Sequence, residues 1–115
     1  MKKYEVYIHE RIFKFVVSVL KICNKFSKTE VNKVIVKQLL RAVTSIGVND
    51  QEADGTTTLK DFVNKYSIVR KEAKETRFWL RIASKMNPKF SPLIAPAIIE
   101  NIEIISQIIF NSQKN

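Results

Sequence analysis

The chain has 115 residues, which is the size of one domain (1–115) with a single modest hydrophobic core. Two glycines and three prolines leave little material for hairpins or irregular loops, so the composition predicts an all-α protein. Twenty basic against eleven acidic residues give a net charge of +9, which favours a polyanionic partner. The alternatives for such a charge are solubility, a membrane contact or an acidic protein partner.

The cysteine count and the apolar pattern also bear on disulfides, metal sites and cellular location. The single cysteine, Cys23, excludes an internal disulfide and a multi-cysteine metal site, and its place on an apolar face predicts a buried structural thiol. Charged residues interrupt the apolar positions of the N-terminus, and the most apolar run, 93–110, contains Glu100 and Glu103. We therefore expect a cytoplasmic protein without a membrane-spanning segment.

Four amphipathic helices are predicted, at about 4–24, 28–54, 58–86 and 92–111. Ser27 with Glu30 has the form of a capping box that opens the second helix, and Gly55 offers a left-handed residue to end it. The threonines at 56–58 then provide the next N-cap. Because the connections are short, neighbouring helices should run antiparallel.

The boundary between the third and fourth helices is marked by prolines. Asn87-Pro88 should end the third helix, because the residue before a proline is pushed out of the helical conformation. Ser91-Pro92 should open the fourth, with the serine as cap and the proline at the first helical position.

Polar residues recur on one flank of the apolar stripe of the second helix, and burial there requires hydrogen-bond partners on a facing helix. The third helix offers them in the stretch 70–80. We interpret Glu72 and Glu75 with Arg41 as part of a structural network, although carboxylates three residues apart could also form an acid/base site. The predicted network comprises Gln38, Arg41, Ser45, Asn49, Glu52, Glu72, Glu75 and Trp79.

Two stretches carry a resemblance to a known family. QLLRAVTSIGVNDQEADG (38–55) and DFVNKYSIVRKEAKETRFWL (61–80) resemble, in order and at constant spacing, the bacterial 23S ribosomal RNA intervening-sequence proteins, a four-helix-bundle family. The matching residues of the second helix are Gln38, Leu39, Arg41, Ala42, Ser45, Ile46, Asn49, Glu52 and Ala53. Those of the third are Asp61, Phe62, Lys71, Glu72, Ala73, Glu75, Thr76, Phe78, Trp79 and Leu80.

The resemblance implies an antiparallel up-down four-helix bundle, often assembled into a ring-like homopentamer. The fold is also similar to that of the accessory protein of diversity-generating retroelements, a basic pentamer that binds RNA and a reverse transcriptase. The family's biochemical activity is not established. The resemblance therefore implies a fold and a class of binding protein more than a biological role.

A stripe of positive charge follows the third helix at intervals of four, three, four and four residues, formed by Arg70, Lys74, Arg77, Arg81 and Lys85. Such a stripe can follow the phosphates of a nucleic acid, and the resemblance implies RNA more than DNA; the alternative is a solvated helix face. The second helix could extend this surface with Lys33 and Lys37, and the first with Lys14, Lys21 and Lys25. Because no pattern of exposed aromatic residues stands out, we expect recognition of shape and backbone with little sequence specificity.

The fourth helix is apolar over more of its circumference than a bundle core requires. One stripe consists of Ile94, Ile98, Ile102, Ile105 and Ile109. The residues that widen the apolar arc are Ile99, Ile104, Ile108 and Phe110. We expect the excess to be buried against another subunit. The alternative is that the first helix and the N-terminal arm cover it.

Enzyme hypotheses find little support in the residues. A di-iron bundle needs Glu-x-x-His on two helices, and the single histidine, His9, stands in no such pattern, so we expect a surface or interface residue. We expect no enzyme activity, catalytic residue, metal or cofactor. The favoured function is a basic oligomeric protein that binds structured nucleic acid. The alternative is a protein-interaction scaffold or an accessory subunit for a partner such as a reverse transcriptase.

Overall fold

The structure, a computed structural model, describes the backbone of residues 3–114 and the side chains of residues 7–108. Within this range it contains four α-helices, one short 3-10 helix and no strand. The elements are α1 (Lys3–Cys23), α2 (Glu30–Asp54), α3 (Leu59–Met86), η1 (Pro88–Phe90) and α4 (Ser91–Lys114). The prediction of an all-α protein with four helices is confirmed.

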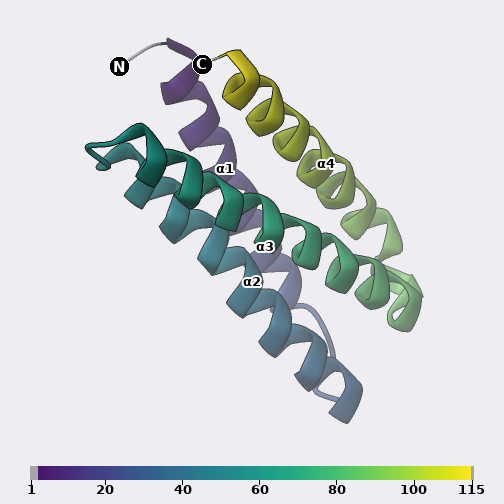
Figure 1. The fold of residues 1–115 in the computed structure, drawn as a ribbon. Coiled ribbons are helices and arrows are strands. Elements are labelled where there is room, and N and C mark those ends of the chain that lie inside the picture. Colours follow the sequence, from purple (N-terminus) through teal and green to yellow (C-terminus); the bar gives the residue numbers. More distant parts are fainter. Residues whose placement is uncertain (1–2, 115) are drawn as a thin grey trace.

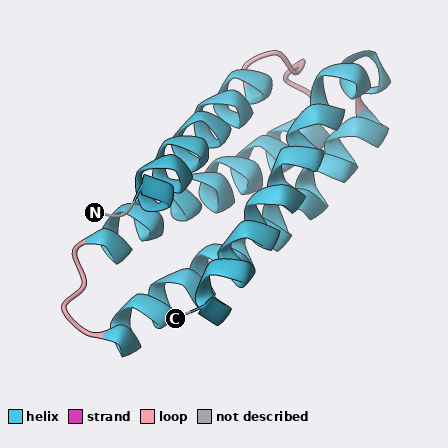
Figure 2. Ribbon diagram, turned by 90° about the horizontal axis from the view of Figure 1, so that it is seen from above, coloured by secondary structure: helices cyan, strands magenta, loops and turns pink. Residues whose placement is uncertain are grey.

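The four helices run alternately up and down and form an elongated bundle of 44 × 21 × 18 Å (Figure 1). Each helix packs on its neighbour in sequence, and α1 also packs on α4, while α1 and α3 make no direct backbone approach and neither do α2 and α4. In the view from above, the connections lie at the ends of the helices (Figure 2). Two of the seams between packed helices, α2–α3 and α3–α4, lie on either side of α3.

The core is built from one apolar stripe per helix. Its fully buried large side chains come from all four helices and include Ile12, Val19, Leu39, Ile46, Val69, Leu80, Ile94 and Ile104. Removing each such side chain from water contributes about 1.5–3 kcal/mol. Cys23 is buried among them, as predicted, and burial raises the pKa of its thiol to about 11, so the thiol stays protonated at neutral pH.

The start of α2 differs from the prediction. Thr29, in extended conformation, is the N-cap and accepts a hydrogen bond from the Asn32 amide at 3.1 Å, so the proposed Ser27–Glu30 capping box is wrong. The reason is tertiary: the buried side chain of Asn32 donates to the Ser27 carbonyl at 2.9 Å and exchanges two 2.9 Å hydrogen bonds with Asn87. This amide pair joins the start of α2 to the end of α3 and holds Ser27 outside the helix.

At the other helix ends, two predictions are confirmed and two are wrong. Thr58 caps α3 by accepting from the Asp61 amide, and α3 ends before Asn87-Pro88 as predicted. Gly55, however, is not left-handed; its φ is −94°. Ser91 is already helical, and its hydroxyl donates to the Ser84 carbonyl at 2.9 Å instead of capping α4.

The buried face of α4 is rotated from the predicted one. Its buried residues are Ile94, Ala97, Asn101, Ile104, Ile105 and Ile108, whereas Ile102 is exposed. Ile104 and Ile108, which we had assigned to an oligomer interface, therefore belong to the core of their own chain. The physical reason is the approach of α4 to α3: buried Asn101 donates to the Ala73 carbonyl at 3.0 Å, which directs this side of α4 inward. The side chain of Phe110 lies outside the described residues.

The capping geometry of α2 yields a prediction about stability. Replacing Thr29 by alanine should lower the free energy of unfolding by about 1 kcal/mol, because the Asn32 amide loses its capping acceptor. Ser27→Ala is the matched control and should change it by less than about 0.5 kcal/mol, since only the backbone carbonyl of Ser27 is used. Urea unfolding of both variants measures this, and a larger loss for Ser27→Ala would restore the capping box.

Candidate nucleic-acid interface

The predicted basic stripe is present on the surface of α3. Lys74, Arg81, Lys85 and Arg70 are exposed and Arg77 is half-buried. At 1.5 Å per residue the stripe is about 22 Å long. Across the described side chains, none of these five groups has a hydrogen bond or an ion pair; the lysines and arginines engaged in ion pairs are Arg11, Lys33, Arg41 and Lys65. The positive charge of the stripe is therefore uncompensated.

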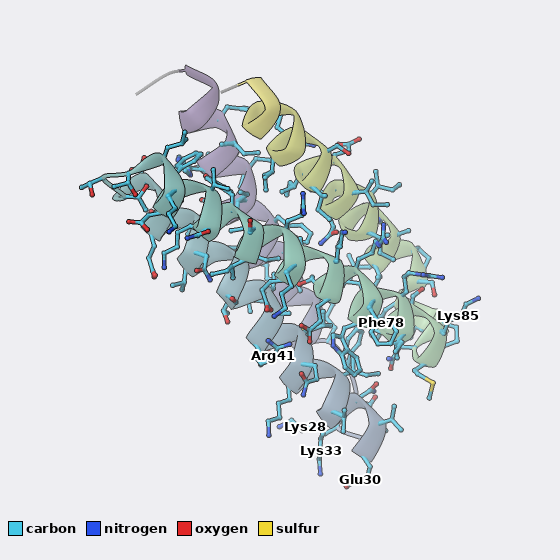
Figure 3. All side chains as sticks on the ribbon, viewed as in Figure 1. Lys28, Glu30, Lys33, Arg41, Phe78 and Lys85 are labelled. Carbon is cyan, nitrogen blue, oxygen red and sulfur yellow. The ribbon has the colours of Figure 1, made fainter. Side chains whose placement is uncertain are left out.

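The stripe lies on the flank of α3 that borders α4. The opposite flank of α3 carries Glu72, which pairs with Arg41 of α2 at 3.2 Å. The Ala73 carbonyl receives the Asn101 side chain of α4, so residues following Ala73 around the helix, such as Lys74 and Arg77, lie toward the α3–α4 seam. Figure 3 shows Lys85 at the end of this helix.

The proposed extensions of the stripe lie elsewhere. Gly47 of α2 lies against Val16 of α1, and Lys33 shares the helix face of Gly47. Lys33 is therefore turned away from α3. Its ammonium group pairs with Glu30 at 3.3 Å. Lys37 is exposed one turn further along the outside of α2. In Figure 3, Lys33 projects from the start of α2, away from Lys85.

The lysines of α1 occupy a third face. Arg11 of α1 forms hydrogen bonds with Glu100 and Glu103 of α4 at 2.6–2.7 Å, which identifies the side of α1 that borders α4. Lys14 and Lys21 recur from Arg11 at helical spacing and are exposed near that side, while Lys25 is exposed just beyond the end of α1. The described structure therefore contains one continuous cationic stripe, on α3, and separate lysines on other faces.

Arg41 is the centre of the polar contacts between α2 and α3 (Figure 3). Its guanidinium donates to Glu72 at 3.2 Å, to Glu75, and to Gln38 at 3.3 Å. The hydrogen bond from Arg41 is the main cause that lowers the pKa of Glu75, and a hydrogen bond from Trp79 adds to it. The same carboxylates raise the pKa of Arg41. Five of the eight predicted network residues thus meet at one place.

The remaining three network residues do not join Arg41. Asn49 donates to the Ser45 carbonyl at 2.9 Å and to its hydroxyl at 3.2 Å, one turn back on the same helix. Glu52 pairs instead with Lys65 of α3 at 3.0 Å. The predicted single network is therefore three separate sets of contacts along the α2–α3 seam.

A second polar cluster was missed in the sequence analysis. Asp50 is 1% exposed and accepts hydrogen bonds from Tyr66 at 2.8 Å and from His9 at 2.9 Å, which joins α1, α2 and α3. His9 Nε2 also lies 3.6 Å from Asp54, so His9 is half-buried against two aspartates of its own chain and is not a surface residue. The pattern could have revealed the cluster, because Asp50 follows Ile46 by one turn on the buried face of α2.

Neither a metal-binding cluster nor a membrane-spanning helix occurs among the described residues. No group of three or more histidine, cysteine, aspartate or glutamate side chains there could hold a metal ion. None of the described helices has both the length and the apolar composition needed to cross a membrane.

Together these features define the class: a basic up-down four-helix bundle with a salt-bridged α2–α3 seam and an uncompensated cationic stripe on α3. The family model described as 23S rRNA-intervening sequence protein matches residues 3–111, and the chain belongs to this family. The resemblance found in the sequence is confirmed, and its two stretches lie within the matched range.

A solved structure supports the same assignment. The chain is 28% identical to a protein of unknown function from the S23 ribosomal protein family of Bacteroides thetaiotaomicron VPI-5482, with a TM-score of 0.83. The similarity covers 91% of this chain and 97% of that one. No curated protein matched the sequence.

The contacts of Arg41 predict a pH dependence of stability. Because the pKa of Glu75 is lower in the folded chain than its ordinary value of 4.5, ionised Glu75 stabilises the fold above that value. This stabilisation is lost as the pH falls through the folded-state pKa. Arg41→Met should therefore lose less stability than the wild type between about pH 7 and about pH 3, measured by urea unfolding.

The matched control is Lys33→Met, which also removes one cation from α2 but breaks only the exposed contact with Glu30. Its pH dependence should parallel that of the wild type. Equal pH dependence for all three proteins would contradict the role given to Arg41.

Proposed function

We propose that the protein binds structured RNA by contacts between the cationic stripe of α3 and phosphate groups, without catalysing a reaction. The observation that carries this proposal is the lack of any ion-pair partner for Arg70, Lys74, Arg77, Arg81 and Lys85 within the described structure. The carboxylates Glu72 and Glu75, which could otherwise neutralise them, are bound to Arg41. The stripe is left available for external anions.

Counterion release supplies the driving force for such binding. Each phosphate that a lysine or arginine neutralises releases condensed cations, so the affinity falls as the salt concentration rises. Arginines can in addition bind a phosphate through two parallel hydrogen bonds. Contacts of this kind recognise the position of the backbone and not the base sequence.

Family membership favours RNA over DNA as the ligand. The family is described by its association with 23S rRNA, and the solved relative is assigned to a ribosomal protein family. Neither description states what those proteins bind. The preference for RNA therefore depends on the family's description, whereas the preference for an anionic polymer depends on the charge of α3.

Assembly of several copies is the second part of the proposal, and a different surface supports it. Exposed apolar residues follow the outer side of α4 at intervals of three or four residues: Pro92, Ala95, Ile99 and Ile102. Ile99 is 58% exposed, so its side chain would gain from burial against a second copy. A homopentamer is the assembly that the family resemblance implies. If the same surface binds a different protein, the chain is a scaffold or an accessory subunit.

Charge reversal tests the RNA proposal. Replacing Arg70, Lys74, Arg77 and Arg81 by glutamate should abolish retention of a structured RNA while circular dichroism still reports a helical protein. In the wild type, the logarithm of the binding constant should fall with the logarithm of salt concentration with a slope of about −4 for five phosphate contacts in one chain.

The matched control reverses lysines on the other faces, Lys14, Lys21, Lys33 and Lys37, and so changes the net charge by the same amount. RNA binding that survives in this control but not in the α3 variant locates the interface on α3. Equal loss of RNA binding in both variants would show that only the net charge matters. Full RNA binding by the α3 variant would exclude the stripe as the binding surface.

Light scattering tests the assembly. We expect the wild type to have the mass of several 13.3 kDa chains and Ile99→Glu to have a lower mass, because a buried carboxylate without a partner is unfavourable at an interface. Val48→Glu, at an equally exposed apolar position of α2, is the control and should keep the wild-type mass. A wild-type mass of one chain would contradict the proposed assembly.

A further inference from the structure

The cationic stripe of α3 borders an exposed aromatic ring. Phe78 of α3 is 54% exposed, one helical turn from Lys74 and from Arg81 and two turns from Lys71 and Lys85. Figure 3 shows Phe78 and Lys85 on the same half of α3. The spacing of aromatic residues in the sequence does not indicate this exposed ring, which lies within the family motif.

The ring has an ordered support. Phe78 and Trp79 are in T-shaped contact, with 5.3 Å between ring centroids and 79° between the ring planes. Trp79 lies one turn from Glu75, whose carboxylate is bound by Arg41. A ring held in this way loses little conformational freedom when a ligand stacks on it.

The charge around Phe78 selects the kind of ligand. The one carboxylate within a turn of it on α3 is Glu75, and that carboxylate is already paired with Arg41. A second carboxylate within two turns, Glu72, is buried and also paired with Arg41, whereas the exposed charged residues, Lys71, Lys74, Arg81 and Lys85, are all positive. A nucleotide combines the two features that match this surface, an anionic phosphate and an aromatic base. Bases within a duplex are already stacked on each other, so only an unpaired base can stack on a side chain.

We infer that Phe78 is a stacking residue for an unpaired base, so that the RNA bound by α3 contains a bulge, a loop or a single-stranded segment. The inference rests on the proposed function and narrows its ligand class. The stripe supplies phosphate contacts on either side of the nucleotide, and Phe78 supplies preference for RNA with an unpaired base over continuous duplex.

The experiment compares two RNAs that share one stem, one fully paired and one with a single bulged 2-aminopurine nucleotide, with the wild type and with Phe78→Ala. The wild type should bind the bulged RNA more tightly and change the 2-aminopurine fluorescence. Phe78→Ala should lose about tenfold or more in affinity for the bulged RNA and less than about twofold for the duplex. Phe78→Tyr should retain the preference, because the tyrosine ring also stacks.

Phe13 of α1 provides the matched control. It is 60% exposed, and the residues three and four positions from it, His9, Glu10, Val16 and Val17, include no lysine or arginine. Phe13→Ala should leave both affinities unchanged. Thermal melting and light scattering of each variant separate loss of stacking from loss of fold or assembly.

The outcomes distinguish this inference from the function on which it rests. Suppose that the wild type binds both RNAs tightly, and that Phe78→Ala leaves the two affinities unchanged or lowers them equally. This result would overturn the inference and leave phosphate binding by α3 standing. Absence of binding to either RNA by the wild type would overturn the proposed function itself. A Phe78→Ala protein that keeps its RNA preference but loses assembled mass would assign Phe78 to a contact between copies.

Discussion

Arg41 of α2 occupies the two carboxylates in the middle of α3, so that the cations of the α3 stripe keep no acidic partner in the described structure. Arg41 of α2 binds Glu72 and Glu75, the carboxylates of the middle of α3, at the seam between the two helices. The positions of Glu72 and Glu75 place them on one flank of α3, where Arg41 pairs with both, while the lysines and arginines at helical spacing lie on the other flank. Packing and electrostatics are thus two results of one contact: it aligns two helices, and it leaves a cationic surface beside α4.

The polar contacts inside the bundle have a similar dual character. The Asn32–Asn87 pair connects the start of α2 with the end of α3, and the buried Asp50 connects three helices through His9 and Tyr66. Because a buried amide or carboxylate is costly without its partners, these contacts penalise any other alignment of the helices. The described stretch of α3 between Tyr66 and Asn87 is thus held at both ends.

The two candidate surfaces of the molecule are neighbours. The cationic stripe of α3 borders α4, and Ile99 and Ile102 are exposed on the outer side of α4. An assembly that buries the apolar residues of α4 would therefore bring cationic stripes of several copies near its interfaces. The proposed RNA binding and the proposed assembly are in this sense coupled, since the density of positive charge offered to an RNA depends on the number of copies.

Local chemistry made much of this protein predictable from its sequence. Apolar periodicity located four helices, Thr58 and Asn87-Pro88 bounded α3, and the spacing of Arg70 to Lys85 placed five cations on one face. These features depend on residues within one or two helical turns of each other, where helical geometry alone determines which side chains are adjacent. The pairing of Arg41 with Glu72 and Glu75 was also accessible, because helices joined by a short connection must face each other.

Tertiary structure decided what the periodicity left ambiguous. The fourth helix is apolar on most sides, so only its approach to Ala73 through Asn101 determined that Ile104 and Ile108 are core and Ile99 is surface. Asn32 moved the start of α2 from Ser27 to Thr29 through a partner 55 residues away. The separation of Lys33 and Lys37 from the α3 stripe likewise depends on which faces of α2 meet its neighbours. The sequence by itself determined the helices and the faces of the amphipathic ones. Their mutual orientation, and with it the surface offered to a partner, required contacts between residues far apart in the chain.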